Sequence, residues 1–202
     1  MSRIRSVALP DFDPDLRAML DADNKTDREL HPTSIRAHHP EIAKAYLRFG
    51  AALKQFSVLP ARLRELVRLR IAFHNQCRSC MAMRYADAVD DGVTEDLVCS
   101  LERPYEADDL TAAEKVALRF ADLLATNHLA VSDRLYAELG LHFSEKEIVE
   151  LGMFSAMCVG FGRLSATWQM HEDLPQRFQV ESGAPVTPWG PDAWTTARPS
   201  SR

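Results

Sequence analysis

The chain of 202 residues lacks a long uninterrupted apolar run. Its first ten residues contain an apolar stretch at positions 7–9 only, which is too short for the core of a signal peptide. No segment approaches the roughly 18 consecutive apolar residues that a membrane-spanning helix requires. We therefore expect a protein that has no membrane segment and is located in the cytoplasm.

An excess of basic residues is also missing. The sequence has 24 Lys and Arg against 29 Asp and Glu, a formal net charge of -5, and no block of consecutive basic side chains. Nucleic-acid-binding domains usually concentrate Lys and Arg on one face to meet the phosphates. The composition therefore predicts that nucleic acid is not a partner.

Cysteine is scarce, with four residues in the whole chain. This number does not suit the dense disulfide framework of small secreted domains. Cys99 and Cys158 are isolated and are expected to be buried thiols, whereas Cys77 and Cys80 form a Cys-x-x-Cys pair. A zinc site would need two further ligands, but the sequence has no second such pair and the nearest histidine is His74. We predict no metal, no cofactor and a redox-active pair.

Alternation of apolar and polar residues with a period of two, the mark of a half-buried strand, is absent as well. Apolar residues instead recur at spacings of three and four, which indicates amphipathic helices. Two capping boxes, Thr111 with Glu114 and Ser144 with Glu147, mark helix starts. The pattern predicts an all-α helical bundle, with helices over 14–23, 40–56, 60–74, 78–90, 94–101, 111–126, 133–139 and 144–170.

These helices divide the chain into three parts. Residues 1–39 have several prolines around one short predicted helix and are expected to form an N-terminal arm or lid. Residues 40–173 are predicted to form the helical core domain, with the cysteine motif inside 40–125. Residues 174–202 are rich in proline and small polar residues and are expected to form an extended tail that is ordered only by docking.

The segment from Glu65 to Arg84 contains the residues best suited to chemistry. It places Cys77 and Cys80 at a predicted helix N-terminus, which stabilises a thiolate. Arg84 follows Cys80 by four residues and would share a face of the predicted helix 78–90 with both cysteines. Its charge would then favour the thiolate. The alternative is that Arg84 is a solvated surface arginine.

Glu65 and His74 are the candidates for proton transfer. Glu65 is surrounded by leucines and valine in the sequence, so it is either a partly buried carboxylate that takes and returns a thiol proton or the ion-pair partner of Arg62 or Arg68. His74 is predicted to be either a proton shuttle or a helix-end histidine that bonds to backbone carbonyls.

The spacing of Glu65, Cys77 and Cys80, followed by a helix that ends at Asp91–Gly92, resembles the carboxymuconolactone decarboxylase superfamily, and within it the alkyl hydroperoxidase D type. The resemblance implies an all-helical, oligomeric protein whose cysteines cycle between dithiol and disulfide. It also implies that Cys80 is the more reactive thiol, Cys77 its disulfide partner and Glu65 part of a proton relay. The family relay uses a histidine four residues after the second cysteine, where this chain has Arg84.

Three functions remain open at this point. The first is a thiol-disulfide oxidoreductase that reduces peroxides or partner disulfides through Cys77 and Cys80. The second is a non-redox decarboxylase of a cyclic lactone acid, in which His74, Arg84 or His171 handles a carboxylate. The third is a redox-sensing helical oligomer without turnover.

The expected partners are a small-molecule peroxide, or a protein disulfide or dithiol donor. Further copies of the chain are also expected, in a trimer or in a hexamer built as a dimer of trimers. The sequence does not indicate whether Trp168, His171 and Glu172, near the end of the last predicted helix, line a pocket.

Overall fold

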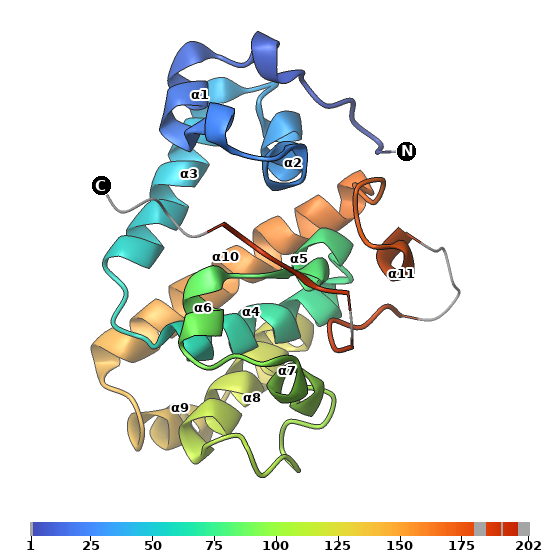
Figure 1. Cartoon of the computed structure of the whole chain (residues 1–202). Coiled ribbons are helices and arrows are strands. Elements are labelled where there is room, and N and C mark those ends of the chain that lie inside the picture. Colours follow the sequence, from blue (N-terminus) through green and yellow to red (C-terminus); the bar gives the residue numbers. More distant parts are fainter. Residues whose placement is uncertain (1, 180–184, 191, 198–202) are drawn as a thin grey trace.

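The computed structural model describes residues 2–179, 185–190 and 192–197. Within these residues the fold is helical, as predicted, with eleven α-helices and one pair of two-residue strands. Figure 1 shows a small helical unit at the N-terminus, a larger helical body below it, and the C-terminal part of the chain lying across that body.

The N-terminal unit, residues 2–39, is more structured than the sequence indicated. The predicted helix over 14–23 is α1 (Pro14–Leu20), which ends where Asp21 takes a left-handed φ of 50°. A second helix, α2 (Asp27–Arg36), was not predicted, and it has Pro32 in its interior, where a proline usually disfavours a helix. Two short 3-10 turns flank α1: η1 (Leu9–Asp11) precedes it, and η2 (Ala22–Asn24) lies between α1 and α2. Its apolar side chains form a cluster with Ala43 of the following helix, made by Phe12, Leu16, Leu20, Ala22, Leu30 and Ala37.

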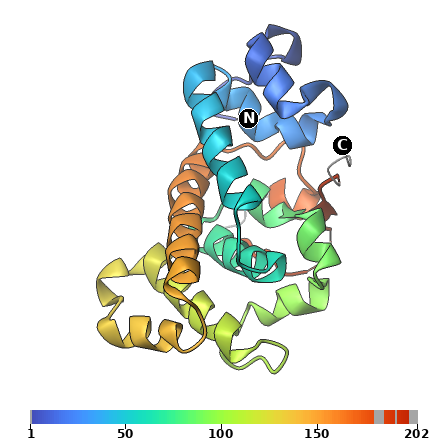
Figure 2. The same ribbon diagram turned by 90° about the vertical axis from the view of Figure 1, so that its left-hand side faces the viewer.

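Four longer helices match the predicted ranges closely, and the first of them packs against α1 and α2. They are α3 (Pro40–Gln55), α4 (Ala61–Asn75), α8 (Ala112–Thr126) and α10 (Glu145–Trp168). Helix α4 lies at the centre, packed against α8 and α10, and its leucine and isoleucine side chains are fully buried. Figure 2 shows α10 running along one side of the body up to the N-terminal unit. The shorter helices α7 (Glu95–Ser100) and α9 (Asp133–Gly140) also lie near their predicted positions.

Helix α10 differs from the sequence-based expectation in one respect. With 24 residues and a mean hydropathy of 1.3 in its most apolar window, it is long and apolar enough, by length and composition alone, to cross a membrane. Core helices of soluble proteins, which are mostly buried, pass the same test, whereas 17% of this window is buried, although α10 packs along α4 and α8. Its opposite side is apolar and exposed, with Val149, Met153, Phe161 and Leu164 at the surface.

The predicted continuous helix over 78–90 is wrong. The chain forms α5 (Arg78–Ala82), the strand β1 (Met83–Arg84) and α6 (Ala86–Asp90). Helix α5 stops because the carbonyl oxygens of Cys80 and Met83 accept hydrogen bonds from Arg68. Strand β1 then pairs in parallel with β2 (Trp194–Thr195), a contact between distant segments that periodicity cannot reveal.

The described part of the tail packs onto the segment that follows the cysteines (Figure 1). It contains the short helix α11 (Gln176–Gln179) and strand β2. The amide of Val186 donates to the side chain of Gln76, and Arg177 donates to the carbonyl oxygens of Thr187, Trp189 and Gly190. The rest of the predicted tail, residues 180–184, 191 and 198–202, lies outside the described residues.

Candidate active site

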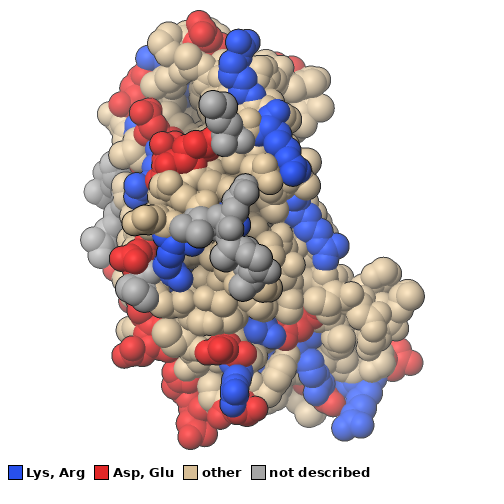
Figure 3. All heavy atoms as spheres, turned by 90° about the vertical axis from the view of Figure 1, so that its right-hand side faces the viewer, with Lys and Arg blue, Asp and Glu red and all other residues tan. Residues whose placement is uncertain are grey.

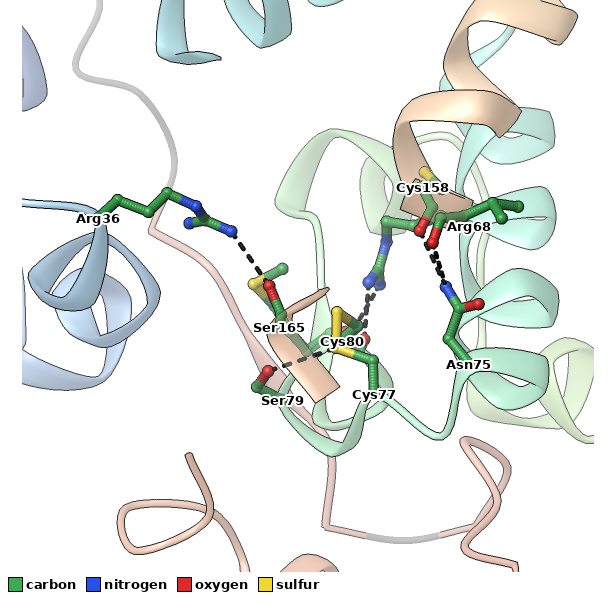
Figure 4. Close-up of a disulfide and its surroundings, with 10 residues drawn as sticks. Arg36, Arg68, Asn75, Cys77, Ser79, Cys80, Cys158 and Ser165 are labelled. Atoms are coloured by element: carbon green, nitrogen blue, oxygen red, sulfur yellow. Dashed lines mark hydrogen bonds between the residues drawn. A yellow bond between two sulfur atoms is a disulfide. The ribbon is translucent and has the colours of Figure 1, made fainter. Parts of the chain in front are cut away.

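Cys77 and Cys80 are joined by a disulfide, with their Cα atoms 5.2 Å apart. Cys77 precedes the first residue of α5 and is fully buried. Cys80 lies within α5, is partly exposed and lines a cavity of about 800 Å³ (Figure 4). Of the two cysteines in the disulfide, Cys80 is therefore the one that a molecule in the cavity can contact.

The cavity lies between the N-terminal unit, helices α4, α5 and α10, and the tail. Its polar lining near Cys80 includes Arg36, Ser79 and Ser165, and Figure 4 shows these side chains gathered around the disulfide. Its apolar lining comes mainly from α10 and the tail and includes Phe154, Met157, Phe161, Met170, Leu174 and Trp194. A site of this volume and mixed lining suits a small organic molecule.

Glu65 forms a buried ion pair with Arg68, one helical turn further along α4. The Nε and Nη2 atoms of Arg68 each lie 2.7 Å from an oxygen of Glu65, and both residues are at least nine-tenths buried. Burial lowers the pKa of Arg68, but the charge and hydrogen bonds of Glu65 more than offset this and raise it above its usual value. Of the two alternatives for Glu65, the structure shows the ion pair with Arg68. A role in proton transfer stays a prediction.

Arg68 connects this pair to the cysteine segment. Its Nη1 and Nη2 atoms donate hydrogen bonds of 2.7 Å to the carbonyl oxygens of Cys80 and Met83, and its guanidinium lies 4.9 Å from the ring centroid of Tyr85. Because a guanidinium offers five donors in a rigid plane, one side chain can bind Glu65 and hold the backbone of α5 together. The sequence predicts Arg68 only as a possible ion-pair partner of Glu65, and its contacts with α5 are seen in the structure alone.

A third thiol, Cys158 of α10, also lines the cavity. Burial raises the pKa of Cys158 to about 12, so it is a neutral thiol near neutral pH. The carbonyl oxygen of Cys158 accepts a 2.9 Å hydrogen bond from Asn75 of α4 (Figure 4). A Cβ atom on Gly162 would stand 2.5 Å from the Asn75 amide nitrogen, so this close approach of α10 to α4 depends on the glycine. Cys99, in contrast, is exposed, so the prediction that it is buried was wrong.

Arg84 does not lie on a helix face with the cysteines, because the helix is interrupted before it. The solvated alternative is also wrong, since Arg84 is only 2% exposed. Its guanidinium makes hydrogen bonds of 2.9 and 3.0 Å to Glu95 and donates to the carbonyl oxygens of Met81 and Pro188 at 2.8 and 2.7 Å. Its contacts thus join β1, α7 and the tail, and an effect on the thiolate stays a prediction.

His74 is separated from the cavity lining. Its Nε2 atom lies 2.7 Å from Oδ1 of Asp122 on α8, which also accepts hydrogen bonds from Arg70 and Tyr105. The predicted bond to helix-end carbonyls is replaced by this carboxylate contact. The structure therefore brings His74 together with Asp122 and not with the residues around Cys80, and its role as a proton shuttle stays a prediction.

The segment after α10 contributes Met170 and Leu174 to the cavity. Trp168 is buried in a small cluster with Ile35 and Met170. Glu172 accepts hydrogen bonds from the amides of Ser2 and His171, so it ties the start of the described chain to this segment.

Charged side chains of both signs are scattered over the face shown in Figure 3. Within the described ranges, no three His, Cys, Asp or Glu side chains are grouped as metal ligands would be.

The comparison with known proteins agrees with this architecture. Residues 40–123 match the model of the carboxymuconolactone decarboxylase family, and this segment carries both cysteines and Glu65. The resemblance to that family is therefore confirmed for the helical segment around the disulfide, residues 40–123.

Relatives among curated proteins are two uncharacterized proteins of Mycobacterium tuberculosis strains, each 34% identical over 152 residues, and an uncharacterized protein of Bacillus subtilis, 28% identical over 136 residues. The matches cover 72% of this chain and 53% of each M. tuberculosis protein, and 65% of this chain and 92% of the B. subtilis protein. The chain thus spans about half the length of the M. tuberculosis relatives.

Two solved structures share the fold, each with a TM-score of 0.66 and 18% identity. One is an alkylhydroperoxidase AhpD core, an uncharacterized peroxidase-related protein from Ralstonia eutropha JMP134, and the match covers 88% of this chain and 94% of that one. The other is a cysteine-to-alanine variant of the debrominase Bmp8 in complex with 2,3,4-tribromopyrrole, with 83% and 90% covered. The predicted fold type is confirmed by these neighbours.

Proposed function

We propose that the protein is a thiol-disulfide oxidoreductase in which Cys80 reacts with the substrate and Cys77 completes the disulfide. The observation that carries this proposal is the asymmetry of the pair: Cys77 is fully buried, whereas Cys80 lines the cavity. The family of the segment and the peroxidase-related neighbour support the same class of chemistry. We place the protein in the reducing cytoplasm, where such a pair can return to the dithiol.

With a peroxide, the Cys80 thiolate attacks one oxygen of the O–O bond. That bond breaks, Cys80 becomes a sulfenic acid, and the other oxygen leaves as an alkoxide that takes up a proton to form the alcohol. The Cys77 thiol then attacks the Cys80 sulfur, so the disulfide forms and water leaves. An external dithiol donor supplies two electrons and two protons and regenerates both thiols.

With a partner disulfide, the same two thiols act in the same order. The Cys80 thiolate attacks one sulfur of the partner, a mixed disulfide forms and one partner thiolate leaves. Cys77 then attacks the Cys80 sulfur and releases the second thiolate. Arg68 holds the backbone of Cys80 in both reactions, and we retain Glu65 as the candidate for taking up the thiol proton.

The test measures peroxide consumption with dithiothreitol as the dithiol donor. We expect turnover in the wild type, and loss of turnover in Cys80→Ser. In Cys77→Ser we expect Cys80 to be trapped as a mixed disulfide or a sulfenic acid, which mass spectrometry detects. Cys99→Ser is the matched control, because Cys99 is an exposed cysteine outside the pair, and it should retain full turnover.

Other outcomes identify the competing functions. Reversible oxidation of the pair without turnover would favour the redox sensor. Retention of all four free thiols under oxidant, in a folded protein, would rule out the redox proposal and favour the decarboxylase. For that last alternative, His74 and Arg84 are paired with Asp122 and Glu95, so they are not placed to handle a substrate carboxylate in the cavity.

A further inference from the structure

Arg36 brings a positive charge into the cavity beside the disulfide. It is the last residue of α2, so it belongs to the N-terminal unit and lies outside the family segment 40–123. Its Nη2 atom donates a 3.1 Å hydrogen bond to Ser165 of α10, and its Cζ atom lies 4.4 Å from the ring centroid of Tyr46 and 5.3 Å from that of Trp168. Figure 4 shows the side chain extending from α2 toward Ser165 and the disulfide.

Within the part of the chain that the structure describes, no carboxylate oxygen lies within 4.0 Å of this guanidinium. Several arginines in the core contact a carboxylate instead, as Arg68 does with Glu65 and Arg70 with Asp122. Burial lowers the pKa of Arg36, because the two nearby tyrosines offset little of the cost of removing the charge from water. Arginine nevertheless stays protonated, so the cavity holds a cation that lacks a counter-ion.

The rest of the lining indicates what kind of anion fits. Around Arg36 and Cys80 the walls are aromatic and sulfur-containing, from Tyr46, Phe154, Met157 and Trp194. Such walls bind flat or flexible apolar groups, whereas the guanidinium plane fits the two oxygens of a carboxylate. Cationic lining residues outnumber acidic ones, with Lys25, Arg28, Arg36, Lys54 and Arg68 against Asp21, Glu29 and Asp87.

We infer that this cavity binds a small organic anion, a carboxylate on an aromatic or other apolar body, with Arg36 as its counter-ion and the body directed toward Cys80. This inference rests on the proposed function in one respect: in the oxidoreductase cycle, the substrate of this class is a hydroperoxide that carries the carboxylate. Cys80 takes up one peroxide oxygen, the O–O bond breaks, and the departing alcohol keeps its carboxylate on Arg36 until it is released.

The first experiment compares two substrates that differ only in charge. The probes are 4-carboxycumene hydroperoxide and its methyl ester, with dithiothreitol as the electron donor. The wild type should use the acid with a kcat/KM about tenfold higher than that of the ester, because one desolvated ion pair contributes that order of affinity. The difference should lie in KM rather than in kcat, since Arg36 holds the substrate and does not touch the peroxide.

Three variants assign the preference to Arg36. Arg36→Met keeps the length and removes the charge, so the acid and the ester should become equal within about twofold. Arg36→Lys keeps a charge without the planar fork and should restore part of the preference. Arg5→Met is the matched control, because Arg5 is an exposed arginine of the same N-terminal unit that is not part of the cavity lining, and its variant should keep the wild-type ratio. Circular dichroism verifies that each variant is folded.

A binding experiment separates this inference from the proposed function. The unreactive alcohol that corresponds to the acid probe is titrated while tryptophan fluorescence is recorded, since Trp168 is next to Arg36 and Trp194 lines the cavity. If the alcohol acid binds tighter than its ester in the wild type and not in Arg36→Met, the anion site is supported even when no peroxide is consumed. Equal affinity for acid and ester in the wild type, or a preference unchanged in Arg36→Met, overturns the inference even when peroxide is consumed.

Discussion

Arg68 ties the carbonyl oxygen of Cys80 to helix α4 through a hydrogen bond of 2.7 Å. The same guanidinium is held by Glu65, which is one turn away on that helix. An ion pair in the core therefore sets the position of Cys80, so a substitution at Glu65 should affect Cys80 without any contact between the two side chains.

Glu65→Gln should strongly destabilise the fold, because it leaves the Arg68 charge buried without a carboxylate. The expected loss in the free energy of unfolding is about 3–5 kcal/mol, measured by urea denaturation. Glu106→Gln is the control, since the Arg103–Glu106 pair has the same spacing but is exposed, with 3.6 Å between its atoms, and should change stability little. Equal effects of the two substitutions would show that burial of the Glu65 pair does not matter.

Asp122 should link stability to acid pH. Burial alone would raise its pKa, but hydrogen bonds from His74, Arg70 and Tyr105 more than offset this and hold the pKa below the usual value. A pKa lowered in the folded state means that the contribution of Asp122 is fully present above the unfolded-state pKa, about 3.9, and is lost as the pH falls through the folded-state pKa.

Asp122→Asn should therefore lower the free energy of unfolding at pH 7, by about 1–3 kcal/mol, and flatten its dependence on pH below about 4. Thermal unfolding followed from pH 2 to 7 measures both effects. Asp108→Asn, at an exposed carboxylate, is the control. A parallel loss of stability at every pH would contradict the assigned cause.

Arg84→Met should loosen the tail. The guanidinium donates to the carbonyl oxygen of Pro188, and the carbonyl oxygen of Arg84 accepts from the amide of Thr196 at 2.9 Å. Losing the first contact weakens the β1–β2 pairing, so amides in 192–197 should exchange with deuterium faster, as read by mass spectrometry. Arg103→Met, at an exposed arginine, should leave that exchange unchanged.

The same Arg84 variant tests the hypothesis that this arginine holds the Cys80 thiolate. Because Glu95 already neutralises Arg84, we expect the pH profile of Cys80 alkylation by iodoacetamide to stay the same. A profile moved to higher pH would restore the electrostatic role that the sequence indicated.

The exposed apolar side of α10 leads us to propose a homo-oligomer, either a trimer or a dimer of trimers. Val149 is 64% exposed and Met153 48%, and apolar side chains grouped at a surface mark an interaction site. Val149→Glu with Met153→Glu should dissociate the assembly in sedimentation velocity. Ile4→Glu, at an exposed isoleucine of the N-terminal unit, should not. A wild-type monomer at micromolar concentration would refute the proposal.

Local signals explain why most helices were predictable from the sequence. The hydroxyl of Thr111 binds the amide of Glu114, and Ser144 does the same with Glu147, so each capping box marks a helix start through contacts within four residues. The same pattern at Thr26 and Glu29 opens α2, a helix that was not predicted and that has Pro32 in its interior. A proline that falls in a helix interior costs stability, but the surrounding packing can offset that cost.

Long-range contacts explain what could not be predicted. The pairing of Met83 with Trp194 joins segments that carry no pattern of their own, and together with the hydrogen bonds from Arg68 it accounts for the broken helix. Arg36 and Cys80 line the same cavity only because the N-terminal unit packs over α10, so nothing near Arg36 in the sequence indicates the cavity. The cysteine pair itself could be predicted from the sequence, because only two residues separate Cys77 from Cys80.

The walls of the cavity come from both ends of the chain as well as its middle, and this sets an order of events during synthesis. Ala86, just after the cysteines, donates to the side chain of Thr196, which is made 110 residues later. A ribosome therefore releases Cys77 and Cys80 well before the wall around them is complete. Until then, the nascent pair meets cellular oxidants and thiols without the selection that the finished cavity provides.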